Sequence, residues 1–362
     1  MRPISKFSIN QFRGITDLTL DGLGDINILV GDNNVGKTSI LEAICCWHAP
    51  QDINNIVMLA RTRIEAYLDR TLNITFDAFY SLFPYSKMND EKYIDLSITF
   101  NNNTHSMMIR GGIEKRIMQV APHKNFEIDN EMLYLREINE EVEEVDIECF
   151  VGVMSLDKNT IEICVRSDGY RYREITNPFI EMHYVSPGHH LIYRNITRGT
   201  MYFNKDILKL IKLFDNEIID YGLEMNILNK RPIEMIHHKK LGVVPVFTFG
   251  DGLKRVLTLA RYIVQAKNGV LLIDEIDTSI HVSILTEIFQ WFIRACKKFN
   301  VQVFASTHSL EALKCLTDIA IQDKQSDLVV FKIEHYNENF FAKRYSEEKL
   351  GFIINEMGQD VR

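Results

Sequence analysis

A short segment near the amino terminus has the residue types and the spacing of a phosphate-binding loop. Residues 31–38 match the pattern G-x-x-x-x-G-K-[ST]. Glycine lets such a loop curl so that successive backbone N–H groups point at phosphate oxygens, and the start of the following helix adds partial positive charge. We therefore expect a phosphate group to be bound by this loop and the first helical residues, namely Gly31, Asn33, Asn34, Gly36, Lys37, Thr38 and Ser39.

Two side chains at the end of this loop would act on a bound nucleotide. A lysine in this position reaches the β- and γ-phosphates, and the hydroxyl of the next residue ligates Mg²⁺. The flanking residues have the required character, because the apolar run 26–30 indicates a buried strand and residues 38–44 have a helical pattern. The loop therefore predicts ATP and Mg²⁺ as cofactors, with Lys37 on the phosphates and Thr38 on the metal.

A second apolar strand ends in two carboxylates. Residues 270–273 are Val-Leu-Leu-Ile, and Asp274 and Glu275 follow them directly. Ligands of open α/β sheets bind at the carboxyl ends of the strands. We expect Asp274 to join the Mg²⁺ shell, and we expect Glu275 to orient or deprotonate the water that attacks the γ-phosphate.

Two further segments have features of an anion site. A third apolar strand, residues 301–305, is followed closely by His308, which would hold the γ-phosphate at the same edge of the sheet. Residues 249–255 combine glycines with the start of a helical pattern, a layout that suits an anion but also fits a simple turn. The candidates for a phosphate contact in this segment are Gly250, Asp251 and Gly252.

These motifs require a sheet that gathers the carboxyl ends of its strands. Residues 4–30 form short apolar runs, which indicate a strand pair broken at Arg13-Gly14 and then the buried strand. Residues 203–230 have a helical period, and residues 270–333 alternate helix and apolar strand. This alternation predicts an α/β fold of the P-loop NTPase type, with helices on both faces of the sheet.

The middle of the chain has a different pattern. Several segments between residues 51 and 182 alternate apolar and polar positions and are separated by turn-like stretches such as 101–103. We interpret residues 51–182 as a β-rich insertion that divides the ATPase domain into residues 1–50 and 183–362. The acidic run 140–148 predicts a solvated face, and its alternative is a docking surface for a basic partner.

Composition and charge limit the class of protein. The 362 residues are 46% hydrophobic and 25% charged, as in soluble globular proteins. No apolar run approaches the roughly 18 residues that a membrane span needs, and the amino terminus lacks a signal-peptide pattern, so we expect a cytoplasmic protein without a membrane partner. The net charge of −8 gives no global attraction to DNA. Contact with DNA would therefore need local basic residues, such as 237–240 or Lys254 and Arg255.

The order of these motifs resembles the ATP-binding-cassette-type ATPases of the AAA family, of the structural-maintenance-of-chromosomes and overcoming-lysogenization-defect kind. The resemblance covers residues 1–50 and 241–320. It assigns residues 31–38 and 271–275 to the Walker motifs, residues 249–255 to the signature motif, and His308 to the switch histidine. It also places Asp277 in the D-loop. The resemblance implies an ABC-type mixed sheet and a homodimer or larger homo-oligomer, with each ATP held between the P-loop of one subunit and the signature of another.

Two functional hypotheses follow from this resemblance. The first is an ATP-driven switch that controls a separate effector protein, such as a nuclease, in bacterial anti-phage defence. It fits because the roughly 55 residues after His308 leave no room for the topoisomerase-primase nuclease domain of family members that cut DNA. The second is a repair or processing ATPase that binds duplex DNA directly. A nucleotide-binding subunit of a transporter is disfavoured by the β-rich insertion.

Overall fold

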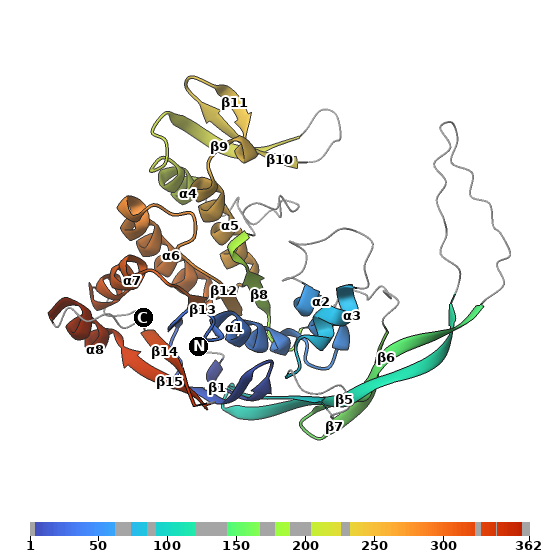
Figure 1. Ribbon diagram of the computed structural model, residues 1–362. Coiled ribbons are helices and arrows are strands. Elements are labelled where there is room, and N and C mark those ends of the chain that lie inside the picture. Colours follow the sequence, from blue (N-terminus) through green and yellow to red (C-terminus); the bar gives the residue numbers. More distant parts are fainter. Residues whose placement is uncertain are drawn as a thin grey trace, which may run out of the picture.

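The computed structural model describes residues 4–61, 74–84, 92–120, 143–166, 178–188, 204–225, 232–322, 327–337 and 339–356. Its centre is a six-stranded sheet in the order β15-β14-β3-β13-β12-β8 (Figure 1). The strands are β3 (Ile26–Val30), β8 (Met182–Val185), β12 (Val270–Ile273), β13 (Gln302–Ser306), β14 (Leu328–Tyr336) and β15 (Asn339–Ser346). All neighbours are parallel except β14 and β15. This confirms the predicted α/β fold, with β15 as an antiparallel edge strand.

The strands of this sheet are buried on both faces, which explains why they are apolar without alternation. Every residue of β3, β12 and β13 is buried. Leu29 belongs to the core cluster shared with helix α1 (Lys37–Cys45), whereas Ile28 and Val30 belong to the cluster on the other face. The helices of that other face are α5 (Asp251–Gln265), α6 (Leu285–Phe299) and α7 (Leu310–Gln322).

A second six-stranded sheet is antiparallel and has the order β2-β1-β4-β5-β6-β7. Its strands are β1 (Ile4–Phe12), β2 (Ile15–Asp21), β4 (Lys92–Phe100), β5 (Asn103–Val120), β6 (Glu143–Leu156) and β7 (Asn159–Arg166). The predicted strand pair around Arg13-Gly14 is confirmed. The strands after residue 92 do not form a separate sheet, because β4 pairs with β1. In Figure 1 the β5–β6 ribbon extends far from the central sheet.

Short helices complete the region between these two sheets. They are η1 (Cys46–His48), α2 (Ile53–Arg61) and α3 (Ile74–Tyr80). Apolar residues of α2 and α3 share one core cluster with α1 and with β1 and β4. Most of the acidic run 140–148 lies outside the residues whose side chains the structure describes.

The prediction of a helical period across residues 203–230 is wrong beyond its first part. Helix α4 (Asn204–Ile211) is followed by strand β9 (Ile218–Met225), and β9 pairs with β10 (Pro232–His238), which pairs with β11 (Gly242–Pro245). The buried carboxylate of Glu234 on β10 lies 3.2 Å from the Arg261 guanidinium on α5. It also accepts a hydrogen bond of 2.6 Å from Tyr221. Tertiary contacts with α5 therefore decide the conformation of this segment.

The remaining elements are short turns near the site and near the carboxyl terminus. They are η5 (Val246–Thr248), η6 (Val282–Ile284), α8 (Glu347–Gly351) and η7 (Phe352–Glu356). Among the described residues, none of the helices has both the length and the apolar character that crossing a membrane requires.

One buried amide links the two large sheets. Gln302, at the start of β13, accepts a hydrogen bond of 3.0 Å from the Ile4 N–H. Its amide nitrogen donates to the Ile4 carbonyl at 2.8 Å and to the Gly24 carbonyl at 2.9 Å. The side chain is only 3% exposed, so water does not replace these bonds.

We predict that Gln302→Leu lowers the free energy of unfolding by about 2 to 4 kcal/mol, because the Ile4 N–H and carbonyl lose their buried partner. Chemical denaturation measures this change. The control is Gln322→Leu at the exposed end of α7, for which a change within about 0.5 kcal/mol is expected. Equal effects of the two substitutions would contradict the role assigned to Gln302.

Candidate functional site

The loop between β3 and α1 has the strained backbone that its glycines allow. Gly31 has φ 142° and Gly36 has φ 96°, and Asn34 also has a positive φ of 64°. A Cβ atom on Gly31 would lie 2.4 Å from the Ile333 carbonyl oxygen on β14. Glycine is therefore required at residue 31 for two reasons, its backbone conformation and its close approach to β14.

Lys37 lies at the centre of this loop. Its side chain is buried, and its ammonium donates to the carbonyl oxygens of Gly31 and Asp32, each at 2.8 Å. Burial lowers the pKa of Lys37, although Asp274, Asp32 and Glu275 oppose this shift because their carboxylates favour the charged ammonium. The lysine is thus already held against the loop that it would close around a phosphate. Asn33 and Asn34 are exposed on the same loop.

Asp274 connects the loop to the end of β12. The Thr38 hydroxyl donates to Oδ2 of Asp274 at 2.8 Å, although Thr38 and Asp274 lie on strand–helix units separated by β13. The end of β13 bridges them, because the Ser306 hydroxyl donates to Oδ1 of Asp274 at 2.5 Å. The structure therefore brings together the two residues predicted to hold the metal. Ser306 was not predicted, since an isolated serine after a strand carries no distinctive pattern.

The oxygen atoms of Thr38 and Asp274 fit a magnesium ion. Mg²⁺ prefers oxygen ligands and usually combines one or two carboxylates with water and substrate phosphates. Within the described part of the chain, no group of three or more His, Cys, Asp or Glu side chains forms a metal cage of its own. A metal at Thr38 and Asp274 would therefore depend on a bound nucleotide for further ligands.

Glu275 has an unusual backbone at the end of β12. Its φ is 50°, a left-handed conformation that is uncommon for a residue with a side chain. The Glu275 N–H donates to the Ser306 hydroxyl at 2.9 Å, and the Thr278 hydroxyl donates to Oε2 of Glu275 at 2.9 Å. These bonds hold a half-buried carboxylate one residue beyond Asp274.

The predicted D-loop and switch histidine lie beside this carboxylate. Asp277 accepts a hydrogen bond of 2.6 Å from the hydroxyl of Thr307, which is fully buried. The bond connects the segment after Glu275 to the segment after β13. His308 follows directly and is exposed. Ser309 begins α7 by accepting a hydrogen bond of 3.0 Å from the Ala312 N–H.

The end of strand β8 also contacts Asp274. The Tyr184 hydroxyl is 3.4 Å from Oδ2 of Asp274, the same oxygen that Thr38 contacts. The Asp274 N–H donates to the Val185 carbonyl at 2.9 Å, which aligns the ends of β8 and β12. The sequence alone did not predict this contact of Tyr184 with Asp274, because a tyrosine at the end of an apolar strand is common in cores.

The glycines predicted for the signature begin α5 and have different surroundings. Gly250 precedes the helix, and nothing lies within 4 Å of the position of a Cβ atom there. A Cβ atom on Gly252 would lie 2.6 Å from the Ser279 carbonyl and 2.7 Å from the Phe214 ring. Asp251 forms an ion pair of 2.6 Å with Lys254 within the helix. Gly252 thus packs α5 against the segment that follows Glu275, whereas the space beside Gly250 is open.

Arg255 does not belong to a basic surface, so its assignment to a DNA contact is wrong. The side chain is 0% exposed, and burial lowers the pKa of its guanidinium to about 10, although Asp274, Asp277 and Glu275 oppose the shift. It donates to three carbonyl oxygens at the strand ends: Ser186 at 2.9 Å, Asp274 at 3.1 Å and Glu275 at 2.9 Å.

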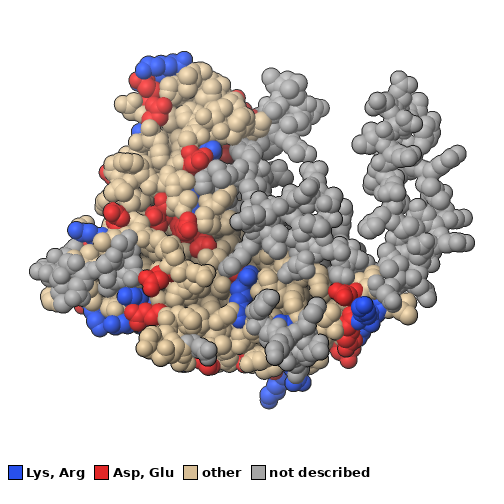
Figure 2. All heavy atoms as spheres, in the orientation of Figure 1, with Lys and Arg blue, Asp and Glu red and all other residues tan. Residues whose placement is uncertain are grey.

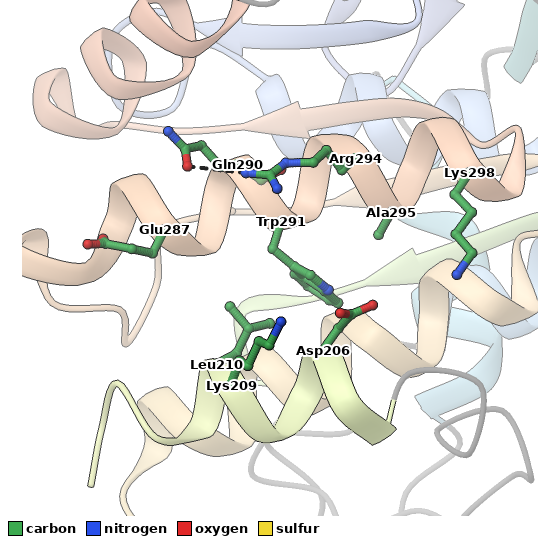
Figure 3. A pocket seen from close by; sticks show the side chains of 9 residues that line it. All are labelled: Asp206, Lys209, Leu210, Glu287, Gln290, Trp291, Arg294, Ala295 and Lys298. Atoms are coloured by element: carbon green, nitrogen blue, oxygen red, sulfur yellow. Dashed lines mark hydrogen bonds between the residues drawn. The ribbon is translucent and has the colours of Figure 1, made fainter. Parts of the chain in front are cut away.

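A separate cavity of about 340 Å³ lies between α4 and α6 (Figure 3). Trp291 of α6 and Asp206 and Leu210 of α4 face one another across it. Its rim carries Lys209, Glu287, Gln290, Arg294 and Lys298. None of these residues takes part in the phosphate-binding arrangement, and both signs of charge are present.

Together, the curled loop, the Thr38–Asp274 contact and the doubly covered parallel sheet define a P-loop NTPase fold. The chain belongs to the family described as "AAA domain, putative AbiEii toxin, Type IV TA system", whose profile matches residues 111–314. A second profile, described as "AAA ATPase domain", matches residues 3–161. The protein is therefore an ATPase.

Similar proteins include relatives from bacteria and archaea. The chain is 23% identical to an "ATP/GTP phosphatase" of Helicobacter pylori, over 96% of this chain and 99% of the relative. It is 32% identical to an uncharacterized protein of Methanocaldococcus jannaschii over 31% of this chain and 98% of that protein. A short segment is 49% identical to the DNA replication and repair protein RecF of Pseudoalteromonas translucida, over 11% of each chain.

Solved structures with the same fold are Smc head domains. One is the Smc head bound to the C-winged helix domain of ScpA, with a TM-score of 0.52, 12% identity and coverage of 96% of this chain and 100% of that one. Another, from Pyrococcus furiosus, has an extended coiled coil and is bound to the C-terminal domain of ScpA. Its TM-score is 0.51, with 12% identity and coverage of 99% and 100%. Because the sequence identity is only 12%, this similarity shows the fold alone.

The surroundings of the two glycines give a prediction about stability without nucleotide. We expect Gly252→Ala to lower the free energy of unfolding by about 1 to 3 kcal/mol, because the added methyl group overlaps a backbone carbonyl. Gly250→Ala is the matched control and should change it by less than about 0.5 kcal/mol. Thermal and urea denaturation measure both. A Gly250→Ala protein less stable than Gly252→Ala would show that the packing of α5 is misassigned.

Proposed function

We propose that this chain binds ATP with Mg²⁺ at the P-loop and hydrolyses the γ-phosphate. The observation that supports the proposal is the 2.8 Å contact between Thr38 and Asp274, two residues whose oxygen atoms would bind one metal beside the loop. Lys37 would bind the β- and γ-phosphates, Ser39 and the loop N–H groups the remaining oxygens, and Glu275 would accept a proton from the attacking water. His308 would contact the γ-phosphate from the neighbouring strand end.

ATP would lie between two copies of the chain. Gly250 supports this idea, because it begins α5 with open space around it, and a helix start of this kind suits an anion. The backbone around Gly250, Asp251 and Gly252 would meet the nucleotide held by another subunit, and Asp277 would lie beside the same junction. The active assembly would be a homodimer or a larger homo-oligomer.

We further propose that ATP-driven closure controls a separate effector, such as a nuclease, in anti-phage defence. The resemblance to the overcoming-lysogenization-defect ATPases supports this role, as does the family description, which names a toxin of a toxin–antitoxin system. In this proposal residues 1–50 and 183–362 form the ATPase domain. Residues 51–182 form the insertion through which the effector is held or released.

Direct action on duplex DNA is the second candidate, and the short match to RecF favours it. Several local charges argue against it. His238 is buried against Asp215, Arg255 is inaccessible, and Lys239 and Lys240 each lie 3.7 Å from Glu217. On the face shown in Figure 2, the basic side chains of the described residues lie in small separate groups.

Two substitutions test the assignment of the site. We expect Lys37→Ala to lose nucleotide binding, because the phosphates lose their buried cation. We expect Glu275→Gln to bind ATP as the parent does and to hydrolyse it about 100-fold more slowly or worse, because an amide does not accept the proton. Fluorescent-nucleotide titration and single-turnover hydrolysis measure these effects. Equal turnover in Glu275→Gln and the parent protein would refute the role of Glu275.

Light scattering tests the shared nucleotide. The mass of Glu275→Gln should double or rise further when ATP and Mg²⁺ are added, because ATP that is not hydrolysed holds the subunits together. The double variant Lys37→Ala, Glu275→Gln should not respond. A mass that is independent of ATP in Glu275→Gln would contradict ATP-driven closure.

DNA binding is tested by an electrophoretic shift at two salt concentrations. Direct action on duplex DNA predicts a complex whose affinity falls by about 10³-fold between 50 and 200 mM salt, as expected for about six phosphate contacts. The effector proposal predicts no such complex at either concentration.

A further inference from the structure

Helix α5 reaches the catalytic strand ends through one fully buried cation. Arg255 lies in the second turn of this helix, whose start carries Gly250 and Gly252. Its guanidinium crosses to the ends of β8 and β12 and donates to the carbonyls of Ser186, Asp274 and Glu275 at 2.9, 3.1 and 2.9 Å. A planar fork of N–H groups suits several carbonyls at once, whereas a lysine ammonium is a single point charge.

The contact with two successive carbonyls depends on the backbone of Glu275. One nitrogen, Nη2 of Arg255, bonds both the Asp274 and the Glu275 carbonyl. Successive carbonyls point in opposite directions along an extended strand, but a helical conformation of either hand turns them to the same side. The left-handed φ of 50° at Glu275 therefore matches the contact with Arg255.

A second contact ties the start of α5 to the same loop. Gly252 lies so close to Ser279 that a Cβ atom would be 2.6 Å from the Ser279 carbonyl oxygen. The start of α5 therefore contacts both ends of the segment 275–279, Glu275 through Arg255 and Ser279 through Gly252. A displacement of the start of α5 would shift both ends. Figure 1 shows α5 running past the ends of β8 and β12.

We propose that Arg255 is a positioning residue that couples the start of α5 to the conformation of Glu275. Contact of a neighbouring subunit's nucleotide with Gly250–Gly252 moves or steadies α5, and Arg255 transmits this to the two carbonyls that set the Glu275 backbone. This inference rests on the proposed function, since it assumes that Glu275 accepts the proton and that α5 faces a second subunit. The coupling through Arg255 would connect the nucleotide of the neighbouring subunit at Gly250–Gly252 with the ATP site at Glu275.

Arg255→Lys tests the coupling because it keeps the buried charge but loses the fork. We expect kcat to fall by about 10- to 100-fold, the range that follows from a small displacement of a catalytic group. The dissociation constant for a fluorescent ATP analogue with Mg²⁺ should change by less than about threefold, because the Arg255 guanidinium donates to the carbonyls of Ser186, Asp274 and Glu275, which lie outside the P-loop.

Arg261→Lys is the matched control on the same helix. Arg261 is also largely buried, at 14% exposure, but it pairs with Glu234 of β10 at 3.2 Å. We expect this variant to lose stability in thermal denaturation and to keep kcat within about twofold of the parent. A similar loss of kcat in both variants would overturn the proposal, because the effect would then belong to α5 packing in general.

A double-mutant cycle distinguishes positioning from a structural role. If Arg255 acts through the Glu275 carboxylate, then Arg255→Lys should cause no further loss of single-turnover rate in the Glu275→Gln background. A merely structural effect would multiply with the loss caused by Glu275→Gln, and such additivity would overturn the proposal. A kcat of Arg255→Lys within twofold of the parent would overturn it too.

Folding and the underlying assumption are checked separately. Arg255→Gln serves if Arg255→Lys does not fold, and its shorter neutral amide should give the same selective loss of kcat. Failure of both variants to fold, with Arg261→Lys folded, would assign Arg255 to folding and overturn the proposal.

Full activity of Glu275→Gln would refute the proposed function itself. An inactive Glu275→Gln together with an active Arg255→Lys would refute only the coupling.

Discussion

The carboxylate of Asp274 is the point at which three distant segments of the chain meet. Thr38 binds one of its oxygens and Ser306 the other, so the start of α1, the end of β12 and the end of β13 have a fixed relation to one another. This contact requires that the strands be parallel, because only then do their carboxyl ends lie at one edge. It also requires both faces of the sheet to be covered, which the two core clusters achieve. The phosphate-binding loop and the carboxylates are thus held together before any nucleotide binds.

Two buried cations balance the acidic residues at this edge. Burial lowers the pKa of Lys37 and of Arg255, while Asp274 and Glu275 favour the charged form of both. The two cations have different partners. The Lys37 ammonium bonds carbonyls of its own loop and is placed to exchange them for phosphate oxygens, whereas the Arg255 guanidinium bonds carbonyls at the strand ends. One buried cation is therefore bonded to the P-loop, and the other is bonded to the ends of the strands.

The two outer sheets attach to this centre through buried polar links as well as apolar packing. Gln302 joins β13 to β1, and the Glu234–Arg261 pair joins β10 to α5. Removing one member of such a link leaves a buried polar group without its partner, which makes these attachments specific. As a result, the sheet that contains β4–β7 shares its core cluster with α1, and the sheet that contains β9–β11 shares its core cluster with α5.

The sequence by itself determined the phosphate-binding loop, the strand that ends in Asp274 and Glu275, and the alternation of helix and strand over residues 270–333. These features are local, since a glycine pattern, an apolar run or a helical period needs no knowledge of the rest of the chain. Only the tertiary structure decided what depends on distant pairing. The extension of β1 by β4, the strand β9 where a helix was predicted, and the bridge formed by Ser306 arise from contacts between segments far apart in the chain. Arg255 is the clearest example, because a basic residue after a glycine-rich turn has the pattern of a surface charge, and only the position of α5 against β12 buries it on the carbonyls of Asp274 and Glu275.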